Sequence, residues 1–224
     1  MIDYSDSNEN KISKIFNYLH LSFLSSIYFA ACNIFLILSI YLLELKFYNL
    51  FIFFISSVLL GPALVALISF NNKVISDEHF GVTKSFFQGY KKNFFISLKV
   101  WVPLLIIAFV IIFDIKLCFV NSKFLFLIIP LTIMLVINIL LMSYSLMIIS
   151  KYTINTIDTL KLSFYLLIKN PFTSIINLVI ILLSIFILIN SKSIITLFTV
   201  SISCFLIAKN MKHVFFFIEN TYLK

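Results

Sequence analysis

The side chains that could perform catalysis or bind a metal are few and scattered along the chain. The three histidines are far apart, and only Asp77-Glu78-His79 brings groups with metal-ligand chemistry together. A metal site or an acid–base pair needs further such groups at a set spacing, and none follows. A glycine-rich phosphate loop and the motifs HExxH and GxSxG are also missing. We therefore expect no enzyme, no metal and no cofactor. An enzyme acting on lipid or sugar would have to rely on Glu78 and His79.

The cysteines do not form a redox or metal motif either. Cys32, Cys118 and Cys204 each lie within or at the edge of an apolar stretch, and no two are close enough for a CxxC pattern. We interpret them as small apolar packing residues.

The composition indicates the elements that carry these residues. Of the 224 residues, 62% are hydrophobic and only 12% are charged, with a mean hydropathy of +1.11. A soluble domain carries roughly 25% charged residues, whereas lipid solvates apolar side chains directly. Glycine (3) and proline (4) are scarce, which favours long helices. We predict an all-α, polytopic transmembrane helical bundle.

Six apolar stretches approach or exceed the ~20 residues needed to cross a bilayer. They are Tyr18–Leu43, Phe47–Phe70, Phe94–Phe113, Phe124–Ile149, Phe172–Asn190 and Ser193–Ala208. Short turns join the first two and the last two, which indicates three helical hairpins. We expect one membrane domain over 1–224: an N-terminal segment (1–17), hairpin 1 (18–70), a loop (71–93), hairpin 2 (94–149), a second loop (150–171), hairpin 3 (172–208) and a tail (209–224).

The lysines predict an orientation. All 17 basic residues are lysine, which we interpret as the codon bias of an AT-rich bacterial genome. Thirteen fall on the side of the termini and of the two longer loops, and only Lys46, Lys116, Lys123 and Lys192 fall on the other side. Because positive residues stay cytoplasmic, both termini should be inside a bacterial plasma membrane. Trp101 and the tyrosines near span ends fit anchoring at the membrane interface.

The two longer loops contain apolar residues at helical spacing with lysines between them. Phe86, Phe87 and Tyr90 recur beside Lys91 and Lys92, and a similar pattern ends at Lys169. We expect short amphipathic helices lying on the cytoplasmic surface. The two segments, and a weaker one at the N-terminus, end in Asn17, Asn93 and Asn170, the last followed by Pro171. Since asparagine favours the N-cap and proline the first helical position, each would start a hairpin. The near-regular spacing of the asparagines leaves a threefold internal repeat as an open alternative.

The most distinctive string is Gly61-Pro62-Ala63, followed by Ala66. Pro62 cannot donate a hydrogen bond to the carbonyl of Val58, so a kink is expected there. The small residues let another helix approach closely. The kink could be a moving hinge or a static packing notch, and the sequence leaves both open.

These residues carry a resemblance. Gly61-Pro62-Ala63, together with Phe86-Phe87-Gln88-Gly89-Tyr90-Lys91-Lys92-Asn93-Phe94, resembles the YesL-like family of bacterial membrane proteins, catalogued as domain of unknown function 624. Asn33 is similar to the asparagine in that family's first span, and Leu166 to Pro171 looks like a later segment. The resemblance covers most of the chain from Lys14 to about Leu183. It implies proximity to carbohydrate uptake but no established activity.

Two functions remain after these exclusions. The first is a non-enzymatic accessory or interaction partner of a carbohydrate uptake system, with transporter subunits and anionic lipid headgroups as partners and no nucleic acid. The second is a small transporter or channel for an uncharged solute, because polar but uncharged residues such as Asn33 and Asn138 lie within the spans. More often such residues form hydrogen bonds between helices. The oligomeric state stays open.

Overall fold

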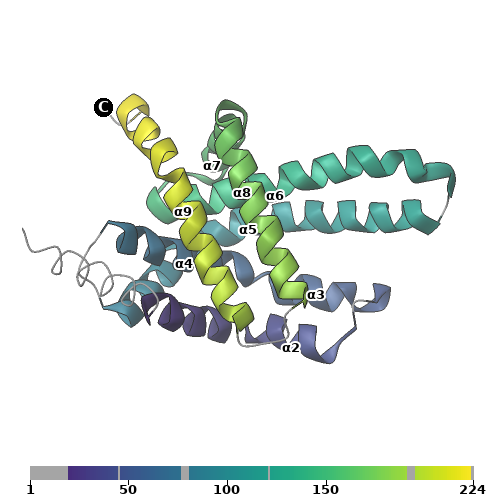
Figure 1. Cartoon of the computed structure of the whole chain (residues 1–224), viewed down its shortest axis with the longest axis horizontal. Helices are drawn as coiled ribbons and strands as arrows, with labels where there is room; N and C mark the ends of the chain where they lie inside the picture. Colours follow the sequence, from purple (N-terminus) through teal and green to yellow (C-terminus); the bar gives the residue numbers. More distant parts are fainter. Residues whose placement is uncertain (1–19, 45, 77–80, 121, 191–194, 223–224) are drawn as a thin grey trace, which may run out of the picture.

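The structure is a computed structural model that describes residues 20–44, 46–76, 81–120, 122–190 and 195–222. Every regular element among these residues is a helix. The first helix covers His20–Cys32. The elements after it (Figure 1) are α2 (Ile34–Leu42), the short 3-10 helix η1 (Phe47–Asn49), α3 (Leu50–Ser57), α4 (Leu60–Ile75), α5 (Val82–Val120), the 3-10 helix η2 (Ser122–Leu127), α6 (Ile128–Lys151), α7 (Thr156–Lys169), α8 (Pro171–Asn190) and α9 (Ile195–Tyr222). The predicted all-α class is confirmed for this part of the chain.

Helix α4 lies at the centre of the core. It packs against α5, α6 and α9, and its residues Ala63, Val65, Ala66 and Leu67 are completely buried. Alanine and valine are small enough to let neighbouring helices approach closely, which is how helices associate where lipid removes the hydrophobic driving force. The sequence stretch after Pro62 is therefore the packing centre of the bundle.

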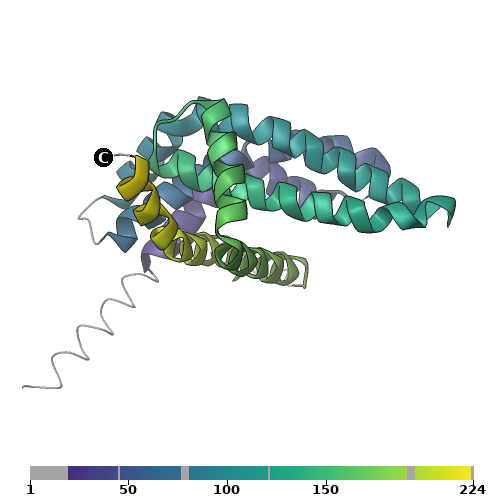
Figure 2. The same cartoon turned by 90° about the horizontal axis from the view of Figure 1, so that it is seen from above.

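Helices α5 and α6 form a long antiparallel pair that extends to one side of the bundle (Figures 1 and 2). With 39 residues, α5 is about 58 Å long at 1.5 Å per residue, against roughly 30 Å of hydrocarbon in a bilayer. It contains both the segment expected as a separate surface helix and the third predicted span. The helix does not start at Asn93, because Phe94 follows and no proline or glycine there interrupts it. Asparagine inside a helix costs only a fraction of a kcal/mol, roughly 0.5, so packing decides.

The break expected at Asn170 is present. Helix α7 ends at Lys169 and α8 begins at Pro171, where the missing backbone N–H of proline is tolerated. The Asn170 side chain does not cap α8, since its Nδ2 donates to the Leu166 carbonyl of α7 at 3.3 Å. The boundary was thus predicted correctly, but the hydrogen bond that was expected to define it is absent.

Helix α7 is amphipathic, as the spacing of its apolar residues predicts. It runs across the long axis of α5 and α6 (Figure 2). Thr159, Ser163 and Leu166 are completely buried against the bundle, whereas Ile157 and Phe164 remain exposed on the opposite side. An amphipathic helix at this angle suits the surface of a bilayer, with its apolar face turned to lipid or to another protein.

Of the six expected spans, four or five are supported among the residues that the structure describes. Four helical stretches are long and apolar enough to cross a membrane by themselves: Leu50–Ile75, Val82–Val120, Phe124–Lys151 and Pro171–Asn190. A fifth is formed if His20–Cys32 and α2 count as one span, although these two helices meet at 74°. The start of the sixth predicted span, residues 193 and 194, lies outside the described residues, and α9 is not among the candidates. Along the candidate spans α6 and α8, exposed aliphatic side chains such as Ile129, Ile133 and Ile189 give the surface that lipid requires.

Candidate functional site

The Gly61-Pro62 motif forms a tight joint between α4 and α5. The helical hydrogen-bond pattern is interrupted at Val58 and Leu59, between α3 and α4, although Leu50–Ile75 still counts as one continuous candidate span. The Ser57 carbonyl accepts a hydrogen bond from Trp101 Nε1 at 3.0 Å instead of one from within its own helix. A Cβ on Gly61 would lie 2.7 Å from the Cβ of Trp101 and 2.8 Å from its Cδ1, so only glycine fits.

Trp101 consequently has a different role from the one expected. Its side chain is 7% exposed and belongs to the core, so it does not anchor the chain at a membrane interface. Tryptophan combines a large apolar surface with one N–H that needs a partner when it is buried. The interruption at Val58 provides that partner by leaving the Ser57 carbonyl available. Nothing in the sequence linked residue 101 to residue 61.

The same two helices approach each other closely at a second position, where Gly89 of α5 lies against α4. A Cβ on Gly89 would lie 3.3 Å from the Ser69 Cβ and 3.6 Å from the Ala66 Cα. The backbones of α4 and α5 are therefore close at both Gly61 and Gly89. Ala63 and Ala66 contribute to the same packing seam, as the small-residue pattern predicted.

The residues expected to form an aromatic and basic surface are divided between surface and interior. Phe86 is completely buried and Asn93 is 8% exposed, whereas Phe87, Lys91 and Lys92 are exposed and Tyr90 is half-buried. The ring of Tyr28 in the first helix packs at a tilt against Phe86 and Phe87, with ring centroids 5.8 and 5.6 Å away. On α7 and α8, Lys169 and Pro171 are exposed and Asn170 is half-buried.

Asn33 lies at the 74° bend between the first helix and α2. Its side chain is 3% exposed, and Nδ2 donates to the Phe29 carbonyl at 2.9 Å. Its Oδ1 is buried without a hydrogen-bond partner. The Asn33 side chain thus adds a second donor at the bend, because the Phe29 carbonyl also accepts from the Asn33 backbone N–H at 3.1 Å.

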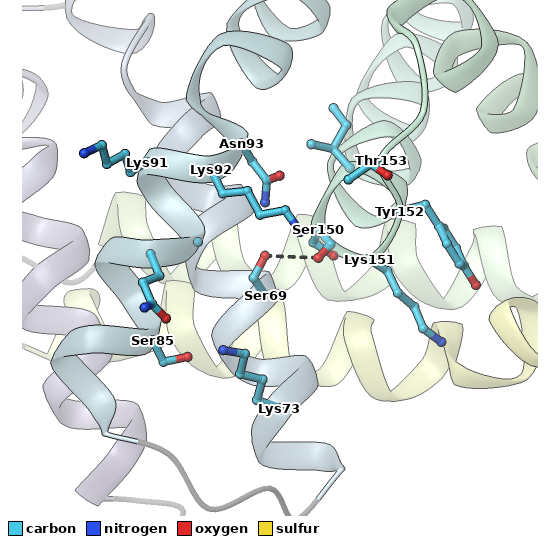
Figure 3. A pocket seen from close by; sticks show the side chains of 13 residues that line it. Ser69, Lys73, Ser85, Lys91, Lys92, Asn93, Ser150, Lys151, Tyr152 and Thr153 are labelled. Carbon is cyan, nitrogen blue, oxygen red and sulfur yellow. Dashed lines mark hydrogen bonds between the residues drawn. The ribbon is translucent and has the colours of Figure 1, made fainter.

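A pocket of about 480 Å³ opens between the end of α4, the first half of α5 and the end of α6 (Figure 3). Four lysines line it, together with hydroxyl and amide side chains and Tyr152: Lys73, Lys91, Lys92, Lys151, Ser69, Ser85, Gln88, Asn93, Ser150 and Thr153. We call it the lysine-rich pocket. Ser69 Oγ donates to the Ser150 carbonyl at 3.2 Å, and Asn72 Nδ2 donates to Ser150 Oγ at 3.1 Å. These two bonds fix α4 to α6 at the wall of the pocket.

Glu219 of α9 contacts two residues of the pocket lining from outside the pocket. Its carboxylate pairs with Lys151 Nζ at 2.7 Å and accepts a hydrogen bond from Tyr152 OH at 3.1 Å. The bond from Lys151 lowers the pKa of Glu219. Partial burial, followed by the neighbouring Glu219 carboxylate, raises the pKa of Tyr152 well above 10.

Metal binding has no visible support in the part of the chain that the structure describes. No three His, Cys, Asp or Glu side chains there lie close enough to hold an ion. The Asp77-Glu78-His79 cluster lies outside the described residues, while His20 and His213 are exposed on different helices. The ammonium groups at the lysine-rich pocket have the charge to attract an anion rather than a cation.

The fold and the site together define a class: a helical membrane protein with a basic pocket where α4, α5 and α6 meet. Residues 18–115 match a family model described as "Protein of unknown function, DUF624". The match covers less than half of the chain, and it includes the Gly61-Pro62 motif, Trp101 and Lys91-Lys92-Asn93. Comparisons with curated proteins and with solved structures find no match. The resemblance expected from the sequence is therefore confirmed at this level, and the description of the family attaches no activity to it.

Proposed function

We propose that the protein is a non-enzymatic accessory protein of a bacterial plasma membrane that binds another membrane protein, a subunit of a carbohydrate uptake system. The observation that carries this proposal is the exposed apolar face of α7. Ile157, Phe164 and Ile168 are 67%, 52% and 62% exposed, although Leu166 and Ser163 on the same helix are completely buried. A helix that is held firmly on one side and apolar on the other offers a contact surface at the membrane boundary.

The interior of the bundle favours this proposal over a solute path. Buried polar side chains pair with one another across helices: Ser39 with Ser56 at 2.9 Å, Ser145 with Ser163 at 3.0 Å, and Tyr144 with Ser174 at 2.9 Å. Hydroxyls that satisfy each other hold helices together. These paired hydroxyls leave few free hydrogen-bond donors and acceptors for a sugar, which needs many of them along a path through the membrane.

The proposed orientation places the lysine-rich pocket and α7 in the cytoplasm, with both termini on the same side. It rests on the lysine distribution, since four lysines gather in one pocket and α7 carries Lys161 and Lys169. Cysteines introduced at Lys161 and Lys116 would test it by labelling with a membrane-impermeant reagent in intact cells. We expect only the second to react.

The partner proposal is tested by affinity purification in mild detergent followed by quantitative mass spectrometry. We expect subunits of an uptake transporter to co-purify with the native chain and to be lost when Ile157, Phe164 and Ile168 are replaced by serine. The matched control replaces Ile129, Ile133 and Ile137, which are exposed on α6, in the same way. Recovery of the native chain without transporter subunits in repeated experiments would overturn the proposal.

The alternative, a small transporter for an uncharged solute, rests on the buried and incompletely satisfied amides of Asn33 and Asn138. Flux of a panel of sugars into reconstituted vesicles tests it directly. Transport that Asn33→Ala or Asn138→Ala abolishes, without loss of the folded protein, would replace the accessory proposal.

A further inference from the structure

The lysine-rich pocket combines high positive charge with a well-defined wall. Lys73, Lys91, Lys92 and Lys151 line it, and no acidic side chain among the described residues does. Glu219 neutralises Lys151 from outside the pocket. Asp77 and Glu78 follow α4 and lie outside the described residues. Lys91 and Lys92 remain on α5 with no ion pair to a described carboxylate.

Figure 3 shows how these side chains are directed. Lys92 and Asn93 extend from α5 toward Ser150 and Ser69, and Lys73 extends from α4 toward Ser85, whereas Lys91 and Lys151 point away. Ammonium, amide and hydroxyl donors from three helices therefore line one pocket in two groups, Lys92 and Asn93 directed toward Ser150 and Ser69, and Lys73 directed toward Ser85. The walls are tied by the Ser69 and Asn72 hydrogen bonds to Ser150, so the arrangement exists before any ligand arrives.

Ser85 provides an independent indication that something binds here. Its side chain is 3% exposed, and its Oγ is buried without a hydrogen-bond partner. Most buried hydroxyls in proteins have a partner, because an unpaired one loses its hydration without compensation. Ser85 belongs to the lining of the pocket, so a change of its side-chain rotamer would turn the hydroxyl toward a ligand oxygen that supplies the missing partner.

The donors select the chemistry of that ligand. Lysine ammonium groups bind phosphate as point charges, and the added hydroxyl and amide donors match the several oxygens of a phosphate group better than the two of a carboxylate. The volume of about 480 Å³ lies within the usual range for small-molecule sites and leaves room for a glycerol or sugar attached to the phosphate. We infer that the lysine-rich pocket binds the phosphate group of a phosphate ester, held by Lys92, Lys73, Ser85 and Asn93.

Two sources supply such a group at this place, a lipid headgroup and a soluble phosphate ester, and one experiment separates them. The full chain, purified in a maltoside detergent that carries no phosphate, is titrated calorimetrically with glycerol 3-phosphate and, separately, with dioctanoyl phosphatidic acid. Dioctanoylglycerol, which lacks the phosphate, is the ligand control. We expect saturable binding of at least one phosphate compound and none of dioctanoylglycerol.

The variants locate the site. Lys92→Gln should weaken binding about tenfold, the usual worth of one charge-assisted contact, and Lys92→Arg should restore most of it. Ser85→Ala, which leaves the charge unchanged, should weaken binding severalfold. Lys161→Gln removes the same charge from α7, outside the pocket, and should leave binding unchanged.

The outcomes are distinct. Binding of glycerol 3-phosphate identifies a soluble ester, and binding of phosphatidic acid alone identifies a headgroup. Absence of saturable binding by both compounds, or equal weakening by Lys161→Gln and Lys92→Gln, would overturn the inference. Because the experiment uses the chain alone, its result does not depend on the partner proposed above.

Discussion

Trp101 of α5 occupies the space that any side chain larger than hydrogen at residue 61 of α4 would need. Its Cβ lies 2.7 Å from the position of a Cβ on Gly61, and its Nε1 donates to the Ser57 carbonyl at 3.0 Å. The indole is therefore fixed by steric fit on one side and by a hydrogen bond on the other. This supports the packing interpretation of the Gly61-Pro62 motif, in which the interrupted helix serves a fixed contact.

The three glycines predict a graded series of substitutions. Gly61→Ala should lower the free energy of unfolding by about 1–3 kcal/mol, because the new methyl group overlaps the buried indole. Gly89→Ala should cost less, since Ser69 can yield by a few tenths of an ångström. Thermal unfolding in detergent, followed by circular dichroism, measures the order.

Gly81→Ala is the matched control for this series. A Cβ there would lie 4.0 Å from the nearest side-chain atom, that of Lys84, so we expect no loss of stability. Combining Gly61→Ala with Trp101→Leu should recover part of the loss, because the smaller side chain makes room. An equal effect of all three glycine substitutions would contradict the close packing described here.

Pro62→Ala should restore a regular helix between α3 and α4. Alanine supplies the backbone N–H that Pro62 lacks, so the Val58 carbonyl gains a helical partner. We expect the distance between spin labels at Phe51 and Ser76, both exposed near the ends of this stretch, to lengthen. Pulsed electron paramagnetic resonance measures this distance in a variant without the native cysteines. An unchanged distance would show that packing alone maintains the break between α3 and α4.

Ser201 joins three parts of the chain. Its Oγ bonds to Ser25 Oγ at 3.1 Å, and its carbonyl accepts from Asn71 Nδ2 at 3.4 Å. Ser201→Ala should reduce stability by about 0.5–1.5 kcal/mol, the usual worth of one interhelical hydrogen bond. A double-mutant cycle with Ser25→Ala tests whether the two losses share one bond. Ser76→Ala, on an exposed hydroxyl, provides the comparison.

The ion pair between Glu219 and Lys151 predicts that the stability of the folded protein falls slightly at acidic pH. Because the pKa of Glu219 is lowered in the folded state, its contribution is complete above pH 4.5 and is lost as pH falls through the lowered value. Both side chains are more than a third exposed, so the loss should correspond to about 1–3 °C in Tm.

Glu219→Gln and Lys151→Gln should each remove this part of the pH dependence, whereas Asp158→Asn, an exposed carboxylate on α7, should retain it. Thermal unfolding at pH 7 and at pH 3.5 makes the comparison. Retention of the full acid dependence by Glu219→Gln would show that other carboxylates account for it.

The helical class and most of the spans could be predicted because they follow from local properties. Apolar length defines a span, and Pro171 directly after Asn170 favours the start of a new helix at that point, whereas Pro103 inside α5 interrupts nothing. Asn93 and Asn170 looked equivalent in sequence, but only Asn170 precedes a proline, and without one α5 continues. The preference of asparagine for helix caps is too weak to break a helix that packs well on α4 and α6.

The site could be predicted only in part, because it depends on contacts between distant residues. Lys91, Lys92 and Asn93 were identified from their spacing, but Lys73, Ser85 and Lys151 meet them through the packing of α4, α5 and α6. The position of Trp101 in its span predicts an interface anchor, because the local sequence does not reveal that Gly61 of another helix lies opposite the indole. A glycine on one predicted helix and a tryptophan on the next are the sequence signal that could have suggested this pair.

The bond between Ser25 and Ser201 also constrains the order in which the chain assembles. The α5–α6 pair joins neighbours in the sequence and can form as soon as both helices enter the membrane. By contrast, 176 positions separate Ser25 from Ser201, and α4 packs on α9. During synthesis the first helix and α4 must therefore wait in the bilayer with an uncovered seam until the last helix is made, and a chain truncated before α9 would leave that seam open to chaperones or proteases.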